Sequence, residues 1–119
     1  MKNTLIIGAT PNKDRYAYKA AERLTQAGHQ IVLFGIKKGI VCGQTIINDW
    51  EDFQNIDTVT LYVGPVRQKD YIEKIISLKP KRVIFNPGTE NSEFQSRLSK
   101  SGIQYEEACT LVLLSINKY

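Results

Sequence analysis

The sequence predicts a single doubly wound α/β domain, with a mainly parallel sheet of five or so strands and helices on both faces. Short apolar, β-branched runs alternate along the chain with segments whose apolar residues recur at helical spacing. Most of the runs are apolar at nearly every position, which is typical of parallel strands buried on both faces. At 119 residues, the chain is long enough for one core and too short for two. We therefore expect residues 1–119 to form one Rossmann-like domain.

The first half of the chain is expected to supply three strands and a helix. Residues 4–8 form the first strand, and a helix starts at about Arg15 and ends before Gly28, because the apolar positions between them share one face. Residues 31–34 form the second strand, and residues 44–47 form a short third one. Asn48 and Asp49 are cap residues that indicate a helical turn over residues 50–53.

The second half repeats the alternation. We expect strands over residues 58–63, 82–85 and 103–105. A helix over residues 71–78 is closed by Pro80, and another around Phe94 and Leu98 is ended by Gly102. The apolar segment 111–116 is assigned to a helix.

Composition and charge favour a small-molecule partner. The net charge of +4 comes without a Lys/Arg block, which argues against nucleic acid. The apolar run after Met1 is too short for a signal peptide or a membrane span. Cys42 and Cys109 are far apart and form no CxxC pair, as in proteins of a reducing compartment. We expect a cytoplasmic protein with no membrane contact; a homodimer would be ordinary at this size.

A ligand site is expected where the predicted strands end, because doubly wound sheets bind ligands outside the carboxyl ends of their strands. The loops there span residues 8–14, 35–43, 64–67, 86–90 and 106–110, and four of the five contain Gly or Pro. His29, the only histidine, precedes a strand and so falls on the opposite rim. Cys109 is on the ligand rim, but no imidazole can activate it. We therefore expect no metal site, no catalytic residue and no enzymatic turnover.

The first two loops indicate a phosphorylated nucleotide. Gly8 allows a sharp turn into a helix whose first N–H groups and dipole favour a phosphate, with Lys13 and Arg15 as charged partners. NAD-binding folds place an acidic residue after the second strand to bind the ribose hydroxyls. This chain has Lys37 and Lys38 there instead. A cation favours a phosphate on the ribose, hence NADP or coenzyme A (CoA) before NAD; the alternative is a solvated lysine pair.

Several stretches resemble the small stand-alone CoA-binding domain proteins, which are similar to the nucleotide-binding domain of the succinyl-CoA synthetase alpha subunit. They are IIGATPNKDRYAYKAAERLTQAGHQIVLFGIKKG, VCGQTI and FNPGTENSEF, with Cys109 late in the chain. The resemblance implies that Gly8, Thr10 and Arg15 face the CoA phosphates and that Lys37 lies near the ribose phosphate and adenine. The loops at residues 64–65 and 86–88 would border the nucleotide or the pantetheine arm. The expected cofactor-binding residues are Gly8, Ala9, Thr10, Lys13, Arg15, Gly35, Lys37, Gly64, Pro65, Asn86, Pro87, Gly88 and Cys109.

Three functions follow from these observations. The leading one is non-catalytic binding of CoA or an acyl-CoA, as a sensor, carrier or regulatory module. The second is an NADP-type dinucleotide-binding domain, although the first loop has one glycine where the dinucleotide fingerprint has three. The third is a scaffold whose nucleotide site has decayed and which acts through a protein interface. It stays open because Gly35-Ile36 and Cys109-Thr110 stand where the resembling family usually has Asn-Pro and Cys-Pro.

Overall fold

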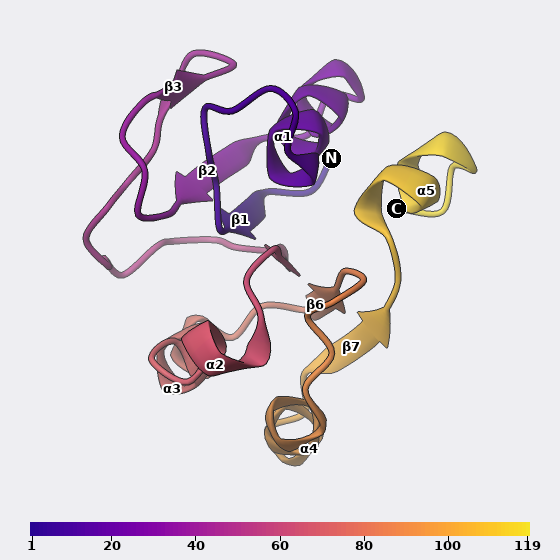
Figure 1. Ribbon diagram of the computed structural model, residues 1–119. Helices are drawn as coiled ribbons and strands as arrows, with labels where there is room; N and C mark the ends of the chain where they lie inside the picture. Colours follow the sequence, from indigo (N-terminus) through magenta and orange to yellow (C-terminus); the bar gives the residue numbers. More distant parts are fainter.

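Five parallel strands form the central sheet of the protein (Figure 1), in a computed structural model that describes residues 1–119. The order across the sheet is β2-β1-β5-β6-β7. The chain moves outward from β1 to β2 on one side and from β5 to β7 on the other, so the order reverses between β1 and β5. The predicted doubly wound sheet is confirmed. Its strands are β1 (Thr4–Ile7), β2 (Ile31–Phe34), β5 (Thr58–Leu61), β6 (Arg82–Phe85) and β7 (Gln104–Glu107).

Burial follows the position of each strand in the sheet. All four residues of β1 and of β5 are buried, because these central strands are covered on both faces. The edge strand β7 has the sequence QYEE and is largely exposed, and its charged side chains disfavour edge-to-edge pairing with another sheet.

Helices cover both faces of the sheet. One face packs against α1 (Tyr16–Gln26) and α5 (Thr110–Ser115) in a core cluster that contains Ile6, Leu24 and Leu33. The opposite face packs against α3 (Ile72–Leu78) and α4 (Ser92–Lys100) in a larger cluster built around Phe85 and Phe94. The predicted helices over 71–78 and 111–116 are confirmed within a residue or two at each end. None of the helices is long and apolar enough to cross a membrane.

The predicted third strand over residues 44–47 is confirmed only in part: Gln44–Thr45 is a strand, but it does not join the main sheet. β3 (Ile40–Val41) and β4 (Gln44–Thr45) form a separate antiparallel hairpin. Cys42 and Gly43 at its tip have φ of 53° and 77°, the positive values that a tight two-residue hairpin turn requires. Only Ile47 reaches the main sheet, through a single parallel bridge to Phe34.

The predicted helical turn over residues 50–53 is wrong, because tertiary packing overrides the local cap signal. Trp50 and Phe53 pack edge-on against Phe34, with ring centroids 5.1 and 6.2 Å away. The Asn48 side chain, expected to cap a helix, instead donates hydrogen bonds to the carbonyl oxygens of Gly35 and Lys37. The segment therefore runs irregularly along the edge of the sheet.

Two boundaries differ in ways that shape the site. The strand expected over residues 58–63 ends at Leu61, and a short helix, α2 (Pro65–Gln68), follows it. The last strand extends to Glu107, so the loop expected over 106–110 is shorter than predicted.

Candidate functional site

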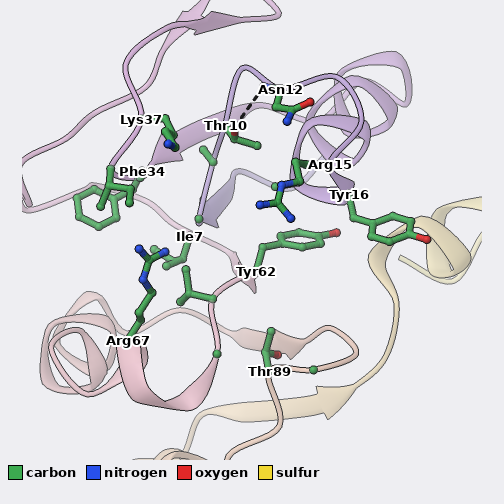
Figure 2. Close-up of a pocket in the computed structure, with 18 of the residues that line it drawn as sticks. Ile7, Thr10, Asn12, Arg15, Tyr16, Phe34, Lys37, Tyr62, Arg67 and Thr89 are labelled. Carbon is green, nitrogen blue, oxygen red and sulfur yellow. Dashed lines mark hydrogen bonds between the residues drawn. The ribbon is translucent and has the colours of Figure 1, made fainter.

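A cleft of about 1030 Å³ lies at the carboxyl edge of the sheet, where the strand order reverses between β1 and β5. Its walls come from the loops after β1, β2, β5 and β6, together with the starts of α1 and α2 (Figure 2). This is the position at which doubly wound sheets bind their ligands. Nine of the expected residues line the cleft: Gly8, Ala9, Thr10, Arg15, Gly35, Lys37, Gly64, Pro87 and Gly88.

The loop after β1 turns tightly over the end of β2. The N–H groups of Gly8 and Ala9 both donate to the Phe34 carbonyl, at 2.9 and 3.0 Å. Gly8 has φ of 95°, and a Cβ at this position would lie 2.9 Å from Val63 Cγ1. Only glycine takes this conformation and this contact together without strain.

The same loop presents the N-terminus of α1 to the cleft. Thr10 Oγ1 accepts a hydrogen bond from the N–H of Asn12, and Asn12 Oδ1 accepts one from the N–H of Asp14, so the loop is closed by its own side chains. No side chain caps α1, and its first turn holds no acidic residue. The N–H groups of that turn therefore have no intrahelical acceptor and can bind an anion.

Two cations line the cleft beside this helix start. Arg15 immediately precedes α1, and Lys37 lies in the loop after β2. Both side chains are exposed, and neither belongs to any of the three ion pairs of the protein. Lys38, by contrast, is not among the lining residues. The cleft therefore offers two separate positive charges to a ligand lying where the strand order reverses between β1 and β5.

The backbone around Lys37 is held from both sides. A Cβ on Gly35 would lie 2.4 Å from the Ala9 carbonyl oxygen, so the loops after β1 and β2 touch through their backbones. On the other side, Asn48 Nδ2 donates to the carbonyls of Gly35 and Lys37 at 2.7 and 2.9 Å. A residue without a Cβ is therefore needed at position 35, where the two loops touch. This role of Gly35 could not be seen in the sequence alone.

Asn86 lies beneath the cleft rather than in its lining. Its side chain is buried and donates to Thr60 Oγ1 at 2.6 Å and to the Leu61 carbonyl at 2.9 Å, while its Oδ1 accepts from the N–H of Thr110. Both the Nδ2 group and Oδ1 of Asn86 are thus engaged within the protein. The structure gives this residue a supporting position under the loop that carries Pro87 and Gly88.

The remaining expected residues also lie outside the lining, which contains neither Lys13, Pro65 nor Cys109. Cys109 is half-buried at the start of α5. His29 is on the opposite rim, as predicted, where its Nδ1 accepts a hydrogen bond from the N–H of Lys2 and burial lowers its pKa. No group of three or more His, Cys, Asp or Glu side chains is arranged to hold a metal ion.

Several lining residues were missed from the sequence. Arg67, Asp70 and Tyr71 come from α2 and the segment after it, and α2 itself was not predicted. The available signal for Arg67 was its positive charge in a loop at the carboxyl edge of the sheet.

Tyr62 also lines the cleft, although the sequence assigned it to a strand. Its buried hydroxyl has no hydrogen-bond partner, and burial raises its pKa to about 12, so the phenol stays protonated at neutral pH.

The fold and the cleft define a doubly wound α/β domain with a candidate ligand site where its strand order reverses. The family model described as a CoA binding domain matches residues 2–115, so the chain belongs to the CoA binding domain family. The resemblance stated from the sequence is confirmed. No curated protein matches the sequence.

Solved structures share this fold over nearly the whole chain. The crystal structure of an uncharacterised protein is 55% identical, with a TM-score of 0.98 over 100% of this chain and 98% of that one. A hypothetical protein from Pyrococcus horikoshii OT3 is 25% identical, with a TM-score of 0.84 over 93% of this chain and 80% of that one. The protein cell-free ID.343 from Thermus thermophilus has a TM-score of 0.86 over 99% and 90%, but at 20% identity it supports the fold alone.

Proposed function

We propose that the protein binds CoA or an acyl-CoA in this cleft without catalysing a reaction, as a sensor, carrier or regulatory module. The observation that carries the proposal is that Arg15 and Lys37, both without ion-pair partners, line one cleft from two different loops. CoA carries a diphosphate and a separate phosphate on its ribose, so it has an anionic group for each cation.

We propose a position for each part of the ligand from the same residues. The diphosphate is proposed to sit at the loop after β1, where the free N–H groups of α1 and Arg15 meet. The ribose phosphate is proposed to lie at Lys37. The pantetheine arm then runs along the wall formed by Gly64, Pro87 and Gly88.

A binding role is favoured over an enzymatic one by the side chains of the cleft. The titratable lining groups include Asp14 and Asp70, and no histidine is among them. Cys109 lies outside the lining, and the only histidine is on the opposite rim. No general base is therefore placed with a partner to orient it at the ligand.

The first test is ligand-dependent melting. CoA at about 100 times its dissociation constant should stabilise the protein by about 2.7 kcal/mol, which raises the melting temperature of a domain this size by roughly 10 °C. NADP at the same concentration should give no comparable shift. A shift with NADP alone would favour the dinucleotide-binding alternative, and no shift with either ligand would favour the scaffold.

A second test separates ribose-phosphate recognition from general charge. CoA should bind about tenfold to a hundredfold more tightly than dephospho-CoA, because a charge-assisted contact contributes about 1.5–3 kcal/mol. Lys37→Ala should remove most of this preference, whereas Arg15→Ala should weaken both ligands by a similar factor. Lys38→Ala is the matched control and should change neither affinity. Equal affinity of the wild-type protein for both ligands, measured by calorimetry, would contradict the role of Lys37.

A further inference from the structure

A third cation, Arg67, lines the cleft from the wall opposite Arg15. Arg15 precedes α1 on one face of the sheet, whereas Arg67 belongs to α2, which leads into α3 on the other face. The Arg67 side chain is exposed, and it forms no ion pair although Asp70 also lines the cleft. Figure 2 shows it extending from α2 toward the interior of the cleft.

The backbone that carries Arg67 is fixed before any ligand arrives. The neighbouring Gln68 is fully buried, and its Nε2 donates to the carbonyls of Val63 and Thr89 at 2.9 and 2.7 Å. Its Oε1 accepts a hydrogen bond from Asn91 Nδ2. The N–H groups of Arg67 and Gln68 both donate to the Gly64 carbonyl. A buried amide with three side-chain hydrogen bonds thus ties α2 to the loop after β6, and little ordering of the backbone remains to oppose binding.

Packing places Arg67 on the Lys37 side of the cleft. Tyr71, which follows Arg67 by four residues, packs against Phe34 with ring centroids 5.2 Å apart. Phe34 is the last residue of β2, three residues before Lys37. In Figure 2, Arg67 lies on the side of Phe34 and Lys37, while Arg15 lies nearer to Tyr16. Two cations from different walls therefore border one part of the cleft.

We infer that Arg67 and Lys37 together bind the ribose phosphate of the ligand, an inference that rests on the proposed function. A phosphate dianion has oxygens enough for an ammonium group on one side and a bidentate guanidinium on the other. A phosphate bound by both would be neutralised by cations from two walls of the cleft. This site thereby selects a ligand with a phosphate on its ribose over one without it.

The experiment compares the affinities of CoA and dephospho-CoA, measured by calorimetry on the full chain. Arg67→Gln should reduce the preference for CoA about tenfold, the loss typical of a charge-assisted contact. Arg67→Lys should restore part of it, because it keeps the charge but loses the bidentate fork. The double variant with Lys37→Ala should bind both ligands equally. Lys69→Gln is the matched control: Lys69 is the exposed cation two positions along that does not line the cleft, and its loss should leave the ratio unchanged.

The outcomes separate this inference from the function on which it rests. A wild-type protein that prefers CoA, with the ratio unchanged in Arg67→Gln, overturns the role of Arg67 and leaves CoA binding standing. Equal weakening of both ligands in Arg67→Gln assigns Arg67 to the diphosphate and also overturns the inference. A wild-type protein that binds neither ligand removes the proposed function itself. Melting curves without ligand check that each variant is folded.

Discussion

Gly35→Ala is expected to lower the free energy of unfolding by about 3 kcal/mol and to weaken CoA binding at the same time. A Cβ at this position would lie 2.4 Å from the Ala9 carbonyl oxygen and 3.0 Å from the Ala9 nitrogen. Both are backbone atoms, so no side-chain rotation can relieve the contact. The loops after β1 and β2 must separate, and these loops carry the phosphate-binding turn and Lys37.

The loss should be visible both in stability and in ligand affinity. At this chain length, a change of about 3 kcal/mol moves the melting temperature by roughly 10 °C. The affinity falls because Ala9 and its neighbours hold the N-terminus of α1 toward the ligand, and their displacement misplaces several contacts together. Chemical denaturation gives the first quantity, and calorimetry with CoA gives the second.

Gly64→Ala is the matched control at the other side of the cleft. Gly64 also lines the site, yet a Cβ there would meet nothing closer than the Gly88 carbonyl oxygen at 4.0 Å, and its φ of −73° suits any residue. Alanine should be tolerated there, with a gain of up to about 1 kcal/mol from the less flexible unfolded chain. A Gly35→Ala variant as stable as Gly64→Ala would contradict the close approach of the two loops.

The main sheet could be predicted because its information is local. The run IVLF is apolar throughout, and TLII and RVIF are apolar after their first residue. Such nearly continuous apolar runs indicate burial on both faces. The hairpin and the irregular segment after it could not be predicted in the same way. Trp50 and Phe53 are placed by their contacts with Phe34, and such contacts between distant positions leave no period in the sequence.

The candidate site was predicted at the level of loops rather than side chains. The rule that ligands bind at the carboxyl ends of strands selected five loops. The loops after β1, β2, β5 and β6 line the cleft, whereas the loop after β7, expected over residues 106–110, does not. Which side chain of a loop faces the cleft depends on its exact turns. Lys13 and Lys37 look alike in the sequence, but only Lys37 lines the cleft. Arg67 fell within the predicted loop over residues 64–67, but the helix α2 that carries it was not predicted.

Asn86 is the clearest case in which the loop was predicted but the direction of the side chain was not. Its position after a buried strand suggested a contact with the ligand, whereas in the structure its side chain bonds to other parts of the protein. Besides its bonds to Thr60 and Leu61, it accepts from the N–H of Thr110 at the start of α5. Thr60 Oγ1 and Thr110 Oγ1 are themselves 2.8 Å apart. One amide thus joins the ends of β5 and β6 to the last helix.

Asn86→Ala is therefore expected to lower the free energy of unfolding by about 4 kcal/mol, because it leaves buried polar partners unsatisfied at about 1–3 kcal/mol each. The urea midpoint should fall while the slope of the transition stays constant. Gln54→Ala is the control: Gln54 is exposed, and its side chain donates only to the nearby Asp52 carbonyl, so its loss should cost less than about 0.5 kcal/mol.

Asn86→Asp distinguishes the hydrogen-bond network from simple loss of volume. The aspartate keeps an oxygen for the N–H of Thr110 but places a second oxygen against the Leu61 carbonyl, where the amide donated. Burial without a cation raises the pKa of this carboxyl in the folded state above its unfolded value. The stability of the variant should therefore fall as the pH rises above the unfolded pKa and recover as the pH is lowered, relative to the wild-type protein. If both Asn86 variants kept wild-type stability and lost only CoA affinity, Asn86 would be a ligand contact after all, as its position in the sequence had suggested.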